Sequence, residues 1–135
     1  MTKKKKVANI WLAKPLDEDY RAARDYLTLL FQPPDVAALV RRLRAAHVVE
    51  YQAKDLLRAS QTHLLDKDNP HVADQLKKIK KRKKMSPVLL VKGDGRNGVT
   101  LTIADGHHRI CASWYCDEDA PIACCVAALA PKRAK

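Results

Sequence analysis

The chain has 135 residues, 47% of them hydrophobic, and its 26 basic and 15 acidic residues give a formal net charge of +11. A chain of this size buries roughly two-thirds of its unfolded surface, so it can fold as one domain without cross-links. No apolar run reaches the roughly 20 residues that a membrane span needs, so we expect no membrane contact. The excess of positive charge favours polyanionic partners.

The start of the chain superficially copies a secretion signal, with a lysine run at 3–6 before an apolar run. Asn9 interrupts the apolar run, and no small-x-small cleavage site precedes Lys14. The adjacent Cys124 and Cys125 would point to opposite faces of a strand, which argues against a disulfide framework. We therefore expect a cytoplasmic protein whose lysine run is a disordered end.

Residues 1–46 are predicted to form a basic tail and a helical hairpin. Pro15 and Asp17 favour a helix start, and Pro33 with Pro34 is expected to end that helix. Its apolar stripe would comprise Leu16, Tyr20, Ala23, Leu27, Leu30 and Phe31. A second helix, starting near Asp35, would bury Val36, Leu39, Val40 and Leu43.

Residues 47–129 are predicted to form a small domain of mixed strands and helices. Residues 48–51 are a strand candidate and residues 54–60 a turn or short helix. Asn69 before Pro70 is a good N-cap pair for a helix that would bury Val72, Leu76 and Ile79. That helix should end near Met85, because the following Ser86-Pro87 pair cannot easily continue it.

Two runs rich in β-branched residues, 88–92 and 99–104, flank a glycine-rich connection, which predicts a β-hairpin. A helix from the following turn to about Cys116 and a strand over 122–126 would complete the domain. The predicted fold class is therefore α+β, a small mixed sheet with helices, preceded by the helical hairpin. Residues 130–135 are expected to be a basic tail.

The turn Asp105-Gly106-His107-His108-Arg109 joins a predicted strand to a predicted helix. A helix that begins directly after a strand presents unpaired N–H groups and a positive dipole end, which attract phosphate. Gly106 allows a sharp turn and a close approach to a ligand. Arg109 offers a bidentate fork for phosphate oxygens, and His107 and His108 supply donors or a proton acceptor. Asp105 is interpreted as a helix cap, or as a partner for a histidine or a metal ion.

The pattern resembles the ParB/sulfiredoxin-like superfamily over about residues 48–126. The matching segments are Ser86-Pro87-Val88-Leu89-Leu90-Val91, Leu101-Thr102-Ile103-Ala104-Asp105-Gly106-His107-His108-Arg109-Ile110-Cys111-Ala112 and Pro121-Ile122-Ala123-Cys124-Cys125-Val126. The resemblance implies a small α/β domain that binds a nucleoside di- or triphosphate with Mg²⁺. Gly106, His107, His108 and Arg109 would bind the nucleotide, and Asp105, His107 and His108 are the catalytic candidates.

Members of that superfamily differ in activity, so the fold alone does not choose among them. Sulfiredoxins place a reactive cysteine where His107 stands, and ParB proteins continue into a DNA-reading domain that does not follow here. An NTPase or a small-molecule kinase is therefore the expected function. The kinase-like members carry a catalytic acid upstream of the motif, for which Glu50, Asp66 and Asp68 are candidates.

Two alternatives stay open. Seven of the eight residues 77–84 are basic, and a non-enzymatic adaptor could grip DNA or RNA phosphates there without sequence preference. Its contacts would be Lys77, Lys78, Lys80, Lys81, Arg82 and Lys84. A metal-dependent ParB-like nuclease is the other alternative. No metal site is predicted from His107, His108, Cys111 and Cys116, and the isolated His47, His63 and His71 are interpreted as surface residues.

Overall fold

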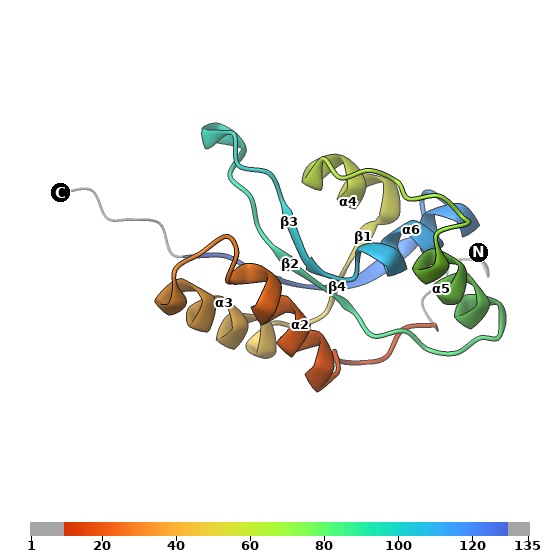
Figure 1. Ribbon diagram of the computed structural model, residues 1–135, viewed down its shortest axis with the longest axis horizontal. Helices are drawn as coiled ribbons and strands as arrows, with labels where there is room; N and C mark the ends of the chain where they lie inside the picture. The colour runs from red at the N-terminus through yellow and green to blue at the C-terminus, as the bar shows by residue number, and fades with distance from the viewer. Residues whose placement is uncertain (1–9, 130–135) are drawn as a thin grey trace.

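A computed structural model describes residues 10–129 (Figure 1). The lysine run at 3–6 and the basic tail 130–135 lie outside the described residues. The elements are α2 (Asp17–Leu27), α3 (Pro33–Ala45), β1 (Val49–Gln52), α4 (Ala53–Ser60), α5 (Pro70–Lys80), β2 (Val88–Val91), a 3-10 turn η1 (Gly95–Asn97), β3 (Thr102–Asp105), α6 (His107–Cys116) and β4 (Pro121–Ala127). This order confirms the predicted α+β class.

The four strands form one mixed sheet in the order β1-β4-β2-β3. β2 and β3 pair antiparallel, which confirms the hairpin, and their register shifts between Leu89 and Leu90. β4 runs parallel to β2 and antiparallel to β1, so the last strand lies between two earlier ones. The turn after β3 therefore lies at one edge of the sheet, where α6 begins.

One face of the sheet packs against α4, α5 and α6 (Figure 1). Its core residues include Leu56 and Leu57 from α4, Val72 from α5, Ile110 from α6, and Val88, Leu90, Ile122 and Cys124 from the strands. Asn69 caps α5 as predicted, since its side-chain oxygen accepts hydrogen bonds from the backbone N–H groups of His71 and Val72.

The opposite face packs against α2 and α3. Ala23, Leu27, Val36, Leu39, Val40 and Leu43 of the hairpin share this core with Leu89, Val91, Ala104, Cys125 and Ala127 of the sheet. The hairpin is thus one of the two layers that cover the sheet, and residue 46 does not separate two hydrophobic cores. Cys124 and Cys125 lie in opposite layers, as the alternation of side chains along a strand predicts.

α2 is shorter than its apolar stripe suggested. It ends at Leu27, and Leu30 is 51% exposed instead of buried. The prolines do not end this helix. Pro33 instead occupies the first position of α3, where the backbone N–H has no partner within the helix and a proline is therefore tolerated. Val36, Leu39, Val40 and Leu43 are buried as expected.

α5 also ends earlier than predicted, at Lys80 instead of near Met85. Arg82 has a φ of 58°, a left-handed conformation that ends the helix. The chain then extends to Met85, which is buried and exchanges backbone hydrogen bonds of 2.7 Å with Ile10 and Leu12. The basic segment 77–84 therefore comprises the last helical turn of α5, a tight turn at Lys81 and Arg82, and a short connection to Met85.

No helix within residues 10–129 combines the length and the apolar character needed to cross a membrane.

Candidate functional site at the start of helix α6

The turn between β3 and α6 depends on Gly106, the N-cap residue of α6. Its φ is 112°, a conformation that side chains with a Cβ rarely adopt. A Cβ at this position would also lie 2.4 Å from Cγ1 of Val88. No side chain within residues 10–129 caps α6, so the expectation that Asp105 caps it is wrong. The first N–H groups of α6 are thus not occupied by a capping side chain.

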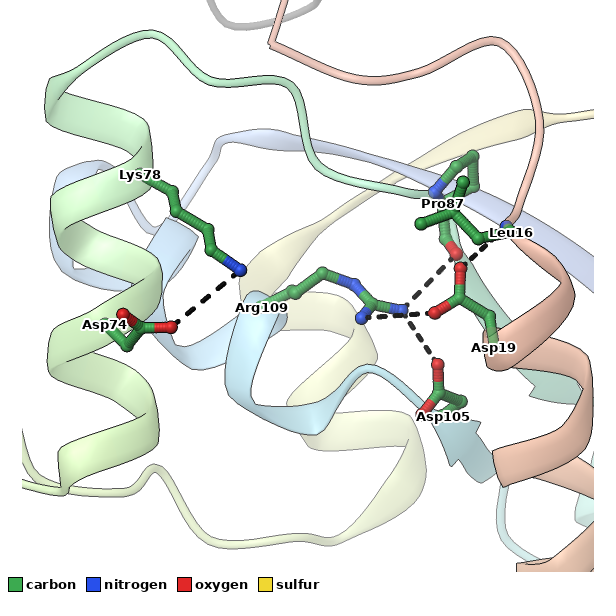
Figure 2. A network of polar contacts seen from close by, with 7 residues as sticks. All are labelled: Leu16, Asp19, Asp74, Lys78, Pro87, Asp105 and Arg109. Carbon is green, nitrogen blue, oxygen red and sulfur yellow. Dashed lines mark hydrogen bonds and ion pairs between the residues drawn. The ribbon is translucent and has the colours of Figure 1, made fainter.

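The Asp105 carboxylate instead binds Arg109, one turn along the chain. Arg109 Nη2 donates to Asp105 Oδ2 at 3.0 Å and contacts the carbonyl oxygen of Pro87 at 3.5 Å. On the other side, Arg109 Nη1 lies 3.8 Å from Oδ1 of Asp19. Figure 2 shows the guanidinium reaching from the first turn of α6 to α2, with the two carboxylates around it. Arg109 therefore joins two helices and the strand end.

This cluster of Asp19, Asp105 and Arg109 is largely removed from water. The exposed fractions of the three side chains are 7%, 20% and 13%, respectively. Burial raises the pKa of Asp105, while the charge of Arg109 and its hydrogen bond act in the opposite direction. Arg109 Nε has no hydrogen-bond partner within residues 10–129. In this arrangement the guanidinium lies between the two carboxylates and is not presented as an open fork.

Sequence reasoning missed Asp19 because it lies in the hairpin, outside the region of resemblance. Its Oδ2 accepts a hydrogen bond of 2.8 Å from the backbone N–H of Leu16, which satisfies one donor at the start of α2. Its Oδ1 faces Arg109. An aspartate in a first helical turn is common, so the sequence held no signal for this second, long-range contact.

A groove of about 560 Å³ lies beside the first turn of α6. Its walls come from α2, from the end of α4, from β3 with the residues before it, and from the turn itself. The lining residues are Ala22, Tyr26, Leu30, Ser60, Thr62, Thr100, Leu101, Thr102, Ile103, Ala104, Asp105, Gly106, His107 and His108. Four of the five residues of the predicted motif therefore share one groove, and Arg109 does not line it.

Histidines gather around this turn. His107 Nε2 donates to the backbone oxygen of His63 at 2.9 Å, which ties the turn to the segment after α4. The rings of His71 and His108 have their centroids 4.8 Å apart. Burial, followed by the neighbouring His71 and His107, lowers the pKa of His108 below its usual value, which favours its neutral form. His63 and His71 are exposed as predicted, yet the fold brings both to the motif.

The remaining sequence candidates lie elsewhere. Glu50, Asp66 and Asp68 are exposed, and none of them lines the groove. Cys111 is buried in the core, whereas Cys116 is exposed at the end of α6. Between residues 10 and 129, no group of three or more His, Cys, Asp or Glu side chains is placed to hold a metal ion.

The basic segment 77–84 lies away from the groove, and none of its residues lines it. Lys78 Nζ lies 3.8 Å from Oδ2 of Asp74. Figure 2 draws this ion pair. The other basic residues of the segment form no ion pair with a carboxylate in the described part of the chain. Because α5 ends at Lys80, Lys81 to Lys84 are not part of the helix in which the sequence analysis placed them.

Comparisons of this chain with protein-family models, with curated proteins and with solved structures find no match. The resemblance to ParB/sulfiredoxin-like proteins therefore remains a prediction based on the motif segments.

Proposed function

We propose that the groove beside α6 binds a nucleotide, with a phosphate group at the first N–H groups of that helix. The observation that carries this proposal is the start of α6, which has no capping side chain among the described residues and borders the groove. A helix start of this kind combines free donors with the positive end of the helix dipole. The resemblance to ParB/sulfiredoxin-like proteins supports the same ligand.

The rest of the groove suits the remaining parts of a nucleotide. Ser60, Thr62, Thr100 and Thr102 place hydroxyl-bearing residues on its walls. Tyr26 and Leu30 add apolar surface, and they are 44% and 51% exposed. Small-molecule sites combine apolar walls with a few polar groups in volumes of roughly 300–1,000 Å³. We assign the apolar end to the base and the α6 end to the phosphates.

The charge at the α6 end is consistent with an anionic ligand. Asp105 is the one carboxylate on the groove among residues 10–129, and Arg109 already binds one of its oxygens. Mg²⁺ would therefore be coordinated mainly by the nucleotide phosphates, and Asp105 would be its available protein ligand. In this arrangement Arg109 acts indirectly, because it offsets the charge of Asp105 and holds the turn in place.

Phosphoryl transfer or hydrolysis is the chemistry that these residues suit. A neutral imidazole at His108 accepts a proton near pH 7, which is the task of a general base. His107 is held by its bond to the His63 carbonyl and supplies a second ring on the groove. The acceptor would be water in an NTPase or a hydroxyl group in a small-molecule kinase.

A charge introduced on the groove wall tests nucleotide binding without disturbing Arg109. Ala22 is an exposed residue of α2 that lines the groove. We expect Ala22→Glu to weaken the binding of ATP, ADP, CTP or GTP with Mg²⁺ by about tenfold or more, since a carboxylate would repel the phosphates. Isothermal titration calorimetry of each nucleotide measures this, and the preferred nucleotide identifies the base.

Ala37→Glu provides the matched control, because Ala37 is an exposed alanine on α3 outside the groove. It should bind the nucleotide as wild type does. Negligible heats with all four nucleotides, or equal losses in the two variants, would contradict the proposal.

Contact between the basic segment and nucleic acid is a second candidate function. Its support is the exposure of Lys80, Lys81 and Arg82, which form no ion pair within residues 10–129. We expect Lys80→Glu/Lys81→Glu to reduce DNA or RNA retention and to lower the salt dependence of binding, because phosphate contacts release counterions. Electrophoretic mobility shifts over a salt series measure both. Ala22→Glu should leave retention unchanged, and the opposite ranking would exclude this function.

A further inference from the structure

A second hollow, of about 490 Å³, lies between α2 and α3. It shares no lining residue with the groove beside α6. We call it the α2–α3 groove. Its position in the hairpin places it outside the region that resembles ParB/sulfiredoxin-like proteins, so that resemblance gives it no function.

The floor of the α2–α3 groove is apolar. Phe31, Pro33, Val36, Ala37 and Val40 line it. Val36 and Val40 are buried in the layer that covers the sheet, and Phe31 packs against the same layer. The floor is therefore held in place by the core, and the hollow it forms is of a size to accept large apolar side chains from outside.

Three arginines, Arg24, Arg41 and Arg44, line the same groove. Arg44 is already engaged, since its guanidinium lies 4.4 Å from the ring centre of Tyr20 and 3.6 Å from the carboxylate of Asp17. Arg24 and Arg41 are exposed and form no ion pair with any carboxylate in the described part of the chain. Among residues 10–129, two positive charges thus remain without a carboxylate partner beside an apolar floor.

We propose that the α2–α3 groove docks an acidic, amphipathic segment of a partner protein. Leucine or aromatic side chains of the segment would enter the hollow, and its carboxylates would pair with Arg24 and Arg41. This matches the mode in which an amphipathic helix lays its apolar face into a groove, with charge complementarity selecting the partner. The inference is independent of the nucleotide site.

A peptide partner fits this groove better than the other anionic partners of a basic protein. A nucleic-acid backbone would contact the arginines but leave the apolar floor uncovered. A membrane surface is bound by apolar side chains that protrude, whereas this apolar surface is concave. Both remain as outcomes that the experiment separates.

The test uses three fluorescein-labelled peptides of about four helical turns each. The first carries leucines at i, i+4 and i+7 with glutamates between them. The second keeps the leucines and replaces glutamate by lysine, and the third keeps the glutamates and replaces leucine by serine. By fluorescence anisotropy the full-length protein should bind the first peptide saturably and the other two at least about tenfold more weakly.

Charge-reversal variants locate the binding. Arg24→Glu/Arg41→Glu should weaken binding of the first peptide by at least about tenfold, because each new glutamate carries the same charge as the glutamates of the peptide. Arg21→Glu/Arg96→Glu is the matched control, since both arginines are exposed, both lie outside the groove and the change in net charge is equal. Ala37→Gln, which places a polar side chain over the apolar floor without altering charge, should also weaken binding.

The proposal fails if the first peptide does not bind, or if all three peptides bind equally. It also fails if Arg24→Glu/Arg41→Glu and the control Arg21→Glu/Arg96→Glu weaken binding of the first peptide to the same extent. If Arg24→Glu/Arg41→Glu abolishes binding of duplex DNA or of phosphatidylserine vesicles but leaves binding of the first peptide unchanged, the two arginines bind nucleic acid or membrane instead of a peptide.

Discussion

Replacing Arg109 by alanine is expected to destabilise the protein by about 3–5 kcal/mol, because removing one partner of a buried ion pair leaves uncompensated charge. Asp19 and Asp105 would face each other in a site where their side chains are 7% and 20% exposed. Urea unfolding followed by circular dichroism measures the loss. Arg24→Ala, at an exposed position on α2, should change stability by no more than about 0.5 kcal/mol.

The pH dependence of the Arg109→Ala variant gives a second readout. Without the guanidinium, burial and the neighbouring carboxylate would raise the pKa of Asp105 further above its model-peptide value of 3.8. A carboxyl group with a raised folded-state pKa destabilises the fold as pH rises through the interval between the two pKa values. The deficit relative to wild type should therefore be smallest below about pH 4. A deficit independent of pH would show that Arg109 stabilises the fold through packing alone.

Gly106→Ala is expected to destabilise the protein by about 2–5 kcal/mol, for two separable reasons. A non-glycine residue in a left-handed conformation costs about 1–2 kcal/mol, and the φ of Gly106 is 112°. The new Cβ would also meet Val88 Cγ1 at 2.4 Å, and overpacking of this kind costs about 1–3 kcal/mol. Thermal and urea unfolding measure the total.

A double-mutant cycle with Val88→Ala isolates the contribution of the contact with Val88 Cγ1. The double variant should be more stable than the sum of the two single losses predicts, because the 2.4 Å contact with Cγ1 is gone, whereas the 2.7 Å contact with Cβ of residue 88 and the backbone term remain. Gly95→Ala is the matched control, since a Cβ there meets no atom within 4 Å. Additive losses in the cycle would rule out the contact with Val88 Cγ1 as a cause.

The elements with local signals could be predicted from sequence. The glycine-rich connection indicated the β2–β3 hairpin, and Asn69 before Pro70 marked the start of α5. Cys124 and Cys125 were placed on opposite faces by strand alternation alone. The motif turn was also placed correctly between a strand and a helix, because glycine at a sharp strand-to-helix turn is itself a local requirement.

The features that depend on distant residues could not be predicted. Arg109 was interpreted as a free phosphate fork, but a carboxylate 90 positions earlier in the chain, that of Asp19, lies beside it. His71 was read as an isolated surface residue because nothing in the sequence indicates that α5 lies against α6. α5 ends before the predicted residue, and Met85, which follows it, is buried and bonded to Ile10 and Leu12, more than 70 positions earlier. Each of these outcomes is set by tertiary packing, which local propensity does not contain.

The position of β4 in the sheet has a consequence for synthesis on the ribosome. β1 and β2 do not touch each other and are joined through β4, so residues 121–127 must emerge before three of the four strands can associate. Until then β1 has no strand partner among the described residues. The apolar side of the α2–α3 helical hairpin also lacks part of the sheet that it covers. Strand pairing between residues so far apart in the sequence is slow, and the intermediates that precede it are prone to aggregation. We therefore expect the sheet to be completed only after residues 121–127 have emerged.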